Sequence, residues 1–329
     1  MNSTLIDNFQ LLVKQIQYDI DNTKSLSLKM KNKFRLKHIK NALEIIEKYP
    51  SKIKNGEELK NKPGIGQGTI DRINEILKNG KLGEIKTHVS DEYLAHVGEL
   101  EEVYGIGREK AIDLIKNHNI TTVKQLIHAV KNNKIEISDN IKIGLKYYGV
   151  YKDCIPRNEI DKYDTEIQTI VKDPVSAIIC GSYRRKKPTS NDIDILLVDT
   201  RVQTKKQISK SNTLTEFIQK LIKKKIIVDG LTDVDVKTKF MGFCQLPGKP
   251  VRRIDIRFMP CESYYSALLY FTGSGSFNKK MRSVAINAGY LLNEYGLFKR
   301  DTKKMIKVKS EKDIFDILNM EYLEPQFRK

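Results

Sequence analysis

The sequence has few cysteines and no long run of apolar residues. Its four cysteines lie far apart without paired spacing, so they predict neither a zinc site nor a disulfide framework. The first twenty residues lack the continuous apolar core of a signal peptide, and no later stretch is apolar enough to cross a membrane. We therefore expect a protein of a reducing, intracellular compartment that makes no membrane contact.

Acidic residues are also scarce relative to basic ones. The 329 residues include 59 lysines and arginines against 41 aspartates and glutamates, a net charge of +18 that is spread along the whole chain. Such a surface attracts polyanions, which makes nucleic acid the first candidate partner. A Lys- and Asn-rich composition can also reflect AT-rich coding, so motifs have to decide between the two interpretations.

The periodicity of apolar residues changes along the chain and predicts an α+β fold. Residues up to about 150 have helical spacing, whereas strand-like runs such as DIDILLV and RRIDIRFM appear later. Residues 1–87 are basic by themselves, with 17 lysines and arginines against 10 acidic residues. We predict a polar loop at 200–215 and a hairpin tip at 245–251. The expected domains are residues 1–87, 88–150, 151–261 and 262–329.

Two similar stretches, NKPGIGQGTIDRI and EVYGIGREKAIDLI, each place Gly-Ile-Gly before a helical pattern. A turn of this kind directs backbone N–H groups outward at a helix start, where they can hold a phosphate without reading a base. A plain turn between helices is the alternative, but two copies in a basic chain favour binding to the DNA backbone. The predicted contacts are Gly64, Gly66, Gly68, Gly105 and Gly107.

Both stretches resemble the helix-hairpin-helix motif. That resemblance implies that each hairpin also holds Na⁺ or K⁺ through backbone carbonyl groups. The carbonyls would be those of Lys60, Lys62, Ile65, Glu101, Val103 and Ile106.

Three aspartates form a candidate metal site. In SNDIDILLVD, Asp192 and Asp194 alternate with apolar residues and share one side of a strand. In RRIDIRF, Asp255 alternates in the same way and is a candidate third ligand on an adjacent strand. Neighbouring carboxylates repel one another, so a divalent cation between them is favoured over a solvated strand end. Three carboxylates can hold two Mg²⁺ ions for nucleotidyl transfer.

A Gly-Ser turn and several basic residues lie just before the aspartate pair. Gly181 lets the backbone approach a phosphate closely, Ser182 offers a hydroxyl group, and Arg185 offers a bidentate cation. We therefore expect a triphosphate to bind beside the metal pair.

The stretches GSYRRKKPTSNDIDILL, RRIDIRF and YFTGSGSFNKKMR resemble the X-family DNA polymerases, most closely the polymerase beta type. The likeness covers nearly the full chain, including KYPSKIKNG, KFMGFCQLP and INAGYLLNEYGLF. A Gly-Ser turn followed by D-x-D alone is typical only of the wider nucleotidyltransferase superfamily.

The resemblance implies a template-dependent repair polymerase that fills short gaps, as in base excision repair, with dNTPs and two Mg²⁺ ions, for which Mn²⁺ can substitute. By the same resemblance, Asp255 would lie closest to the primer 3′-hydroxyl, with Arg253 as its neighbour. It also implies that Tyr270, Phe271 and Gly273 would form a wall that disfavours ribose. Asn278 would contact the incoming base, and Lys279 and Arg282 would face the template. The implied partner is gapped or nicked duplex DNA, bound by a monomer in the nucleus or in a cellular or viral compartment for DNA replication or repair.

The N-terminal part departs from the family pattern. The family's lyase forms a Schiff base through a lysine at the position of Arg72, and a guanidinium group cannot act as that amine. We expect binding of a 5′-phosphate by Arg35, Lys60 and Arg72, with lyase activity absent or weak. The alternatives for the whole chain are a template-independent nucleotidyltransferase and a gap- or end-binding protein with weak catalysis.

Overall fold

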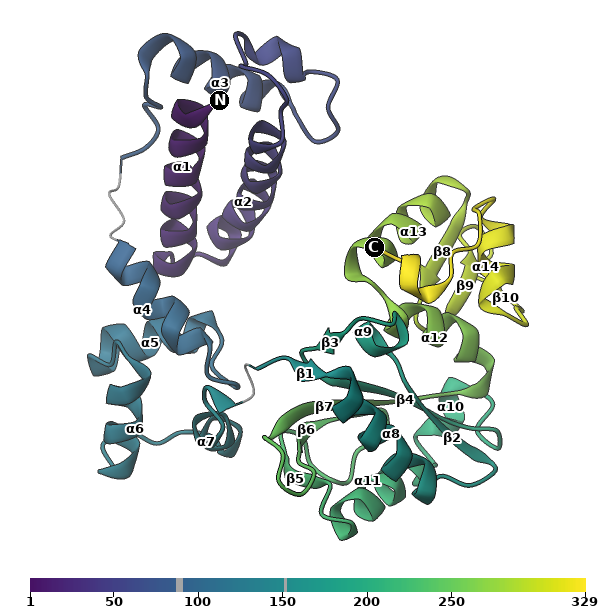
Figure 1. Ribbon diagram of the computed structural model, residues 1–329. Helices are drawn as coiled ribbons and strands as arrows, with labels where there is room; N and C mark the ends of the chain where they lie inside the picture. The colour runs from purple at the N-terminus through teal and green to yellow at the C-terminus, as the bar shows by residue number, and fades with distance from the viewer. Residues whose placement is uncertain (87–90, 151–152) are drawn as a thin grey trace. The chain divides into compact units, whose positions relative to one another are not determined.

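The computed structural model describes residues 1–86, 91–150 and 153–329, which form two compact units, Met1–Ile137 and Ser138–Lys329 (Figure 1). The predicted α+β class is confirmed, since helices fill the first unit and, within the described residues, sheets occur only in the second. The division into four domains stays a prediction, and its boundaries at residues 87 and 151 lie outside the described residues.

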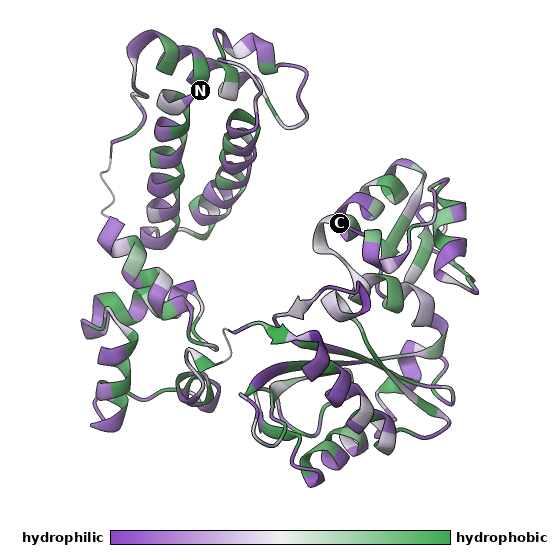
Figure 2. Ribbon diagram, viewed as in Figure 1, coloured by the Kyte–Doolittle hydropathy of each residue, from purple (hydrophilic) through white to green (hydrophobic). Residues whose placement is uncertain are grey.

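The first unit is built from amphipathic helices. Leu5, Phe9, Leu12 and Ile16 follow helical spacing, and all four are fully or almost fully buried against the next helices. Figure 2 shows hydrophobic and hydrophilic residues mixed along these helices, as this packing requires. The elements are α1 (Ser3–Asn22), α2 (Leu26–Glu47), the 3₁₀ turn η1 (Gly56–Leu59), α3 (Gln67–Asn79), α4 (Asp91–Glu101), α5 (Arg108–His118) and α6 (Val123–Lys131).

Both predicted hairpin turns lead into helices. Gly66 is the N-cap of α3 and Gly107 is the N-cap of α5. Gly64 and Gly105 have φ angles of 86° and 88°, a left-handed conformation that favours glycine. The two Gly-Ile-Gly stretches therefore have the same local geometry.

The second unit contains a five-stranded sheet in the order β2-β4-β7-β6-β5, in which only the pair β4 and β7 is parallel. Isoleucines of β4 and β7 pack on one side against α8 and α11, while α12 contacts the other side of β4. The elements are α7 (Asp139–Lys146), β1 (Ile155–Pro156), α8 (Arg157–Ile170), β2 (Val175–Ile179), α9 (Gly181–Arg184), β3 (Thr189–Ser190), β4 (Ile193–Asp199), α10 (Lys205–Ile208), α11 (Thr213–Lys223), β5 (Ile227–Gly230), β6 (Lys239–Cys244) and β7 (Arg252–Met259).

The end of the chain forms a smaller layer of helices and strands. Its core gathers around Phe277, Met281 and Phe315. The elements are η3 (Cys261–Ser263), α12 (Tyr264–Thr272), α13 (Gly275–Asn287), β8 (Tyr290–Asn293), β9 (Gly296–Lys299), β10 (Met305–Ile306), α14 (Glu311–Ile317) and η4 (Pro325–Phe327). Among the described residues, no helix is both long and apolar enough to span a membrane.

The predicted loop at 200–215 is wrong in part, because it contains α10 and the start of α11. Thr204 and Gln207 form a capping box that begins α10, which gives this polar segment a helical turn. The hairpin tip at 245–251 is confirmed, since it joins the antiparallel strands β6 and β7.

Candidate active site

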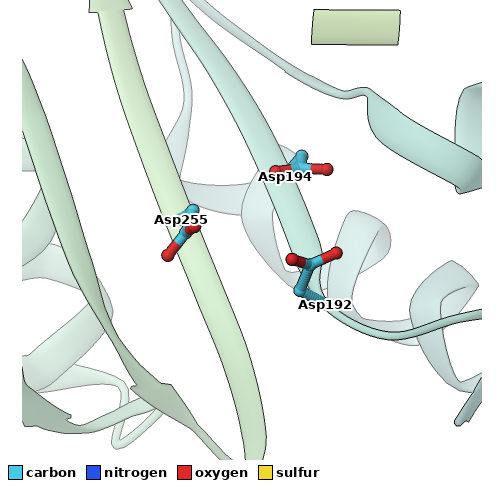
Figure 3. A group of neighbouring side chains, drawn as sticks. All are labelled: Asp192, Asp194 and Asp255. Carbon is cyan, nitrogen blue, oxygen red and sulfur yellow. The ribbon is translucent and has the colours of Figure 1, made fainter. Parts of the chain in front are cut away.

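The three predicted aspartates come together at one end of the paired strands β4 and β7. Asp194 on β4 pairs in register with Asp255 on β7, and Asp192 lies just before β4 begins. One carboxylate oxygen from each residue lies within 4.8 Å of the other two (Figure 3). The alternating residues Ile193 and Ile254 are fully buried on the opposite side of the sheet. The period of two along each strand thus separates the carboxylates from the core.

Burial makes the charges of these carboxylates unfavourable when nothing balances them. Burial, with repulsion from Asp192 and Asp255, raises the pKa of Asp194 to about 7. Burial and the charge of Asp255 likewise raise the pKa of Asp192. Arg253 offsets part of this repulsion, because its Nη2 lies 2.9 Å from Asp255 Oδ1. Clustered oxygen ligands that resist ionisation fit a hard divalent cation.

Gly181 allows the close approach of the Asp194 carboxylate. The residue has a φ angle of 55°, and a Cβ atom at this position would lie only 2.3 Å from Asp194 Oδ2. The sequence predicted that Gly181 makes room for a phosphate, and the structure gives a second reason for glycine here. Ser182 follows on α9, where its hydroxyl group donates a 2.7 Å hydrogen bond to Ser190 Oγ.

A cleft of about 440 Å³ opens beside two of the aspartates. It gathers the predicted nucleotide-binding residues, together with Lys279 and Arg282. Asn191 also lines it and was missed, although it directly precedes Asp192. Asp255 and Arg253 are not part of the lining. The lining residues are Gly181, Ser182, Arg185, Asn191, Asp192, Asp194, Tyr270, Phe271, Gly273, Gly275, Asn278, Lys279 and Arg282.

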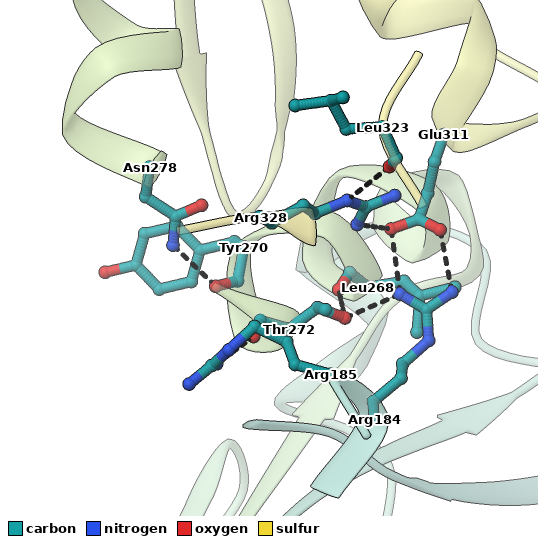
Figure 4. A network of polar contacts seen from close by, with 9 residues as sticks. All are labelled: Arg184, Arg185, Leu268, Tyr270, Thr272, Asn278, Glu311, Leu323 and Arg328. Atoms are coloured by element: carbon teal, nitrogen blue, oxygen red, sulfur yellow. Dashed lines mark hydrogen bonds and ion pairs between the residues drawn. The ribbon is translucent and has the colours of Figure 1, made fainter. Parts of the chain in front are cut away.

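Hydrogen bonds fix the end of α12 that forms one wall of this cleft. Arg185 Nη1 donates to the carbonyl of Thr272 at 2.5 Å, and Asn278 Nδ2 donates to the carbonyl of Tyr270 at 2.7 Å (Figure 4). Gly273 ends the helix with a φ angle of 69°. The guanidinium group of Arg282 lies 5.8 Å from the centre of the Tyr270 ring. Arg185, directly after α9, and Asn278 on α13 thus hold the predicted sugar wall.

A buried ionic network supports the same wall, and no local sequence pattern predicted it. Glu311 on α14 accepts hydrogen bonds from Nη1 and Nη2 of Arg184, at 3.0 and 2.7 Å, and from Nη1 of Arg328 at 2.7 Å (Figure 4). Arg184 donates to Thr272 Oγ1 at 2.6 Å. Burial alone raises the pKa of Glu311, but the two arginines hold it below the ordinary value. The network connects α9, α12, α14 and the end of the chain.

The carbonyl groups predicted to hold a monovalent cation lie at the two hairpin turns. The carbonyl of Lys62 accepts from the N–H of Ile65 at 3.1 Å, and that of Val103 accepts from the N–H of Ile106 at 3.0 Å. A Cβ atom on Gly66 or Gly107 would have no neighbour within 4 Å, so both backbones are open to a ligand. Binding of Na⁺ or K⁺ at the turns stays a prediction.

The predicted phosphate ligands of the first unit have different acidic partners. Arg35 and Arg72 share one acidic partner, Glu84, which the sequence did not single out. Lys60 instead pairs with Glu57 at 3.4 Å. The carbonyl of Gly68 accepts a 2.8 Å hydrogen bond from Arg72 Nη1. A Cβ atom at position 68 would lie 3.1 Å from the same nitrogen.

Comparison with known proteins agrees with this geometry. Family models match a helix-hairpin-helix domain at residues 10–82, the DNA polymerase beta palm at 154–261 and the DNA polymerase beta thumb at 267–329. DNA polymerase lambda of Arabidopsis thaliana is 33% identical over 87% of this chain, and that of Rattus norvegicus is 26% identical over 96%. DNA nucleotidylexotransferase of Xenopus laevis is 25% identical over 98%.

The aligned regions make up 56%, 57% and 68% of these three relatives, so the chain spans little more than half of either lambda polymerase. The palm and thumb matches coincide with the five-stranded sheet and the smaller C-terminal layer that together form the cleft. With its helix-hairpin-helix, palm and thumb domains in this order, the chain belongs to the X family of DNA polymerases.

Proposed function

We propose that this protein is a template-dependent DNA polymerase that fills short gaps during repair. It transfers a nucleotide from a dNTP to the 3′-hydroxyl group of a primer. The observation that carries this proposal is the cleft beside the aspartates, which places Asp192 and Asp194 in one lining with the cationic groups of Arg185, Lys279 and Arg282. Carboxylates that can hold a metal ion, together with these cationic side chains, suit the binding of a metal-bound triphosphate next to nucleic acid.

The aspartate cluster fits divalent cations. Its donors are carboxylate oxygens within 4.8 Å of one another, and its buried charges need a positive partner. Two bound Mg²⁺ ions, or Mn²⁺ in their place, would lower the pKa of the primer hydroxyl and stabilise the charge of the leaving phosphate. Asp255 is the proposed neighbour of that hydroxyl group, and Arg253 fixes the orientation of its carboxylate.

Ser182 on α9 and Arg185, directly after α9, are the proposed triphosphate ligands. Arg185 presents a guanidinium group whose Nη1 is already held by the Thr272 carbonyl, so its direction into the cleft is set before binding. Ser182 now donates to Ser190, so its hydroxyl group has to turn in order to donate to a phosphate oxygen. Both residues follow Gly181, which keeps this turn close to Asp194.

The wall from Tyr270 to Gly273 is the proposed selector of deoxyribose. Its position is defined by hydrogen bonds from Arg185 and Asn278, so the backbone cannot easily retreat from a ribose 2′-hydroxyl. Asn278 contacts the incoming base in this proposal, and Lys279 and Arg282 contact the template.

The helix-hairpin-helix turns are the proposed contacts with the backbone of gapped duplex DNA, in a monomer that acts where DNA is replicated or repaired. Open backbone at Gly66 and Gly107 supports this assignment, as does the net charge of +18. Arg35 and Arg72, with Lys60, bind the 5′-phosphate at the gap. Lyase activity is absent or weak because Arg72 offers no neutral primary amine.

Template-independent transfer is the second candidate, since a relative named DNA nucleotidylexotransferase aligns with 98% of the chain. One assay separates the candidates. The purified protein is given a labelled primer either in a one-nucleotide gap or as a single strand. Extension in the gap alone supports the proposal, extension of both supports the second candidate, and extension of neither indicates a gap-binding protein with weak catalysis.

A further inference from the structure

One glutamate in the first unit binds two arginines from different helices. Glu84 lies in the segment after α3, and its Oε2 is 2.6 Å from Nη2 of Arg35 on α2. The same oxygen accepts from Nη2 of Arg72 on α3 at 3.2 Å, and Oε1 accepts from Arg72 Nε. All three side chains are about one quarter to one third exposed. The two guanidinium groups therefore converge on one anion that water can reach.

The backbone around Glu84 is held independently of its side chain. Asn8 on α1, which is buried, accepts from the N–H of Leu82 at 3.0 Å. Gln15, also on α1, accepts from the N–H of Lys86 at 2.6 Å and donates to the Glu84 carbonyl at 3.0 Å. None of these three hydrogen bonds involves the Glu84 carboxylate. The carboxylate can thus leave the arginines by side-chain rotation while its segment stays in place.

We propose that the Glu84 carboxylate is an internal competitor that occupies the 5′-phosphate site, so that a phosphate monoester binds Arg35 and Arg72 by exchange with it. This inference rests on the proposed function, which assigns the two arginines to the 5′-phosphate. Burial raises the pKa of Glu84, but the arginines hold it below the ordinary value, so the competitor is charged near neutral pH.

The charge of a phosphate monoester explains why it can win this exchange. A monoester carries about −1.5 to −2 near pH 7 and offers three acceptor oxygens, whereas the carboxylate carries −1 and offers two. An internal phosphodiester carries only −1, so it gains no charge advantage over Glu84. The pair of arginines therefore engages the phosphorylated end of a gap, and Glu84 weakens that engagement.

The test compares Glu84→Gln with the wild-type full-length chain. Dissociation constants are measured at one salt concentration for two one-nucleotide gaps that differ only in a 5′-phosphate or a 5′-hydroxyl group. The readout is the ratio of the two constants, which cancels any general gain from the lost negative charge. We expect Glu84→Gln to raise the preference for the 5′-phosphate about fivefold, the size of a partly exposed ion pair.

Two further variants keep the result interpretable. Glu47→Gln removes a charge from the same helix as Arg35, about 18 Å along its axis, and leaves the ratio unchanged. Glu84→Asp keeps the charge but has a side chain that is shorter by one methylene group, so its carboxylate competes less well for the arginines. We expect it to raise the preference for the 5′-phosphate even if the glutamine variant is destabilised. An unchanged or lower ratio in both Glu84 variants overturns the inference, because Glu84 then only organises the arginines.

A wild-type ratio of one, unaltered by Arg72→Gln, also overturns the inference, since the arginines are then no phosphate site. Primer extension in the gap is measured with the same protein preparations. Normal extension together with either of these results means that the inference about Glu84 fails while the polymerase proposal stands.

Discussion

Asp194 on β4 lies directly opposite Asp255 on the parallel strand β7. Parallel pairing brings the two carboxylates to the same side of the sheet although sixty-one positions separate them in the sequence. Asp192 joins them from the residue before β4, and no other cluster of three potential ligands occurs in the described ranges.

Replacing one of these carboxylates should separate catalysis from binding. Asp255→Asn or Asp192→Asn is expected to abolish primer extension and to leave the affinity for gapped DNA nearly unchanged, because that affinity comes from phosphate contacts elsewhere. Extension is measured on a gapped primer and affinity by titration of the same labelled DNA. Near-normal extension by either variant would remove the assignment of the cluster as the metal site.

Gly181 should tolerate no side chain. In Gly181→Ala the new methyl group would lie 2.3 Å from Asp194 Oδ2, in a backbone conformation with a φ angle of 55°. We expect extension to fall at least about a hundredfold, the usual effect of displacing a reacting group by about 1 Å. Gly275→Ala is the matched variant, since it lines the same cleft with nothing within 4 Å of the added atom. Equal extension rates for the two variants would disprove the steric argument.

The buried network around Glu311 should contribute to stability. Glu311→Gln leaves Arg184 and the fully buried Arg328 without their shared anion, which should lower the free energy of unfolding by about 3 kcal/mol. Asp316→Asn breaks the exposed pair with Lys312 on the same helix and should change the free energy of unfolding far less. Denaturant unfolding measures both changes. Similar losses in the two variants would mean that the network is no stronger than a surface pair.

Lyase chemistry should be weak and should respond to one substitution. Arg72 cannot form a Schiff base, and an ordinary exposed lysine is only about 0.1% neutral near pH 7.4. Borohydride trapping on a 5′-deoxyribose-phosphate substrate should give little adduct with the wild type and more with Arg72→Lys. Efficient trapping by the wild type would show that another lysine has taken over.

The sequence predicted β4 and β7 because the alternation of polar and apolar residues can be read within each strand alone. It missed β6, since KFMGFC lacks clear alternation and most of the strand is buried. It also missed the bonds from Glu84 to Arg35 and Arg72, and from Glu311 to Arg184 and Arg328. Those partners lie between 12 and 127 positions apart, and only the folded chain brings them together. Local sequence patterns do not show which residues so far apart will form an ion pair.

The proposed function requires that the template base selects the nucleotide at this site. It is tested most directly by measuring the efficiency of each of the four dNTPs opposite each template base in a one-nucleotide gap, with Asp192→Asn as the inactive control. The complementary dNTP should be strongly preferred opposite every base, and the control should add none. Incorporation that is independent of the template base, or undetectable with the wild-type protein, would contradict it.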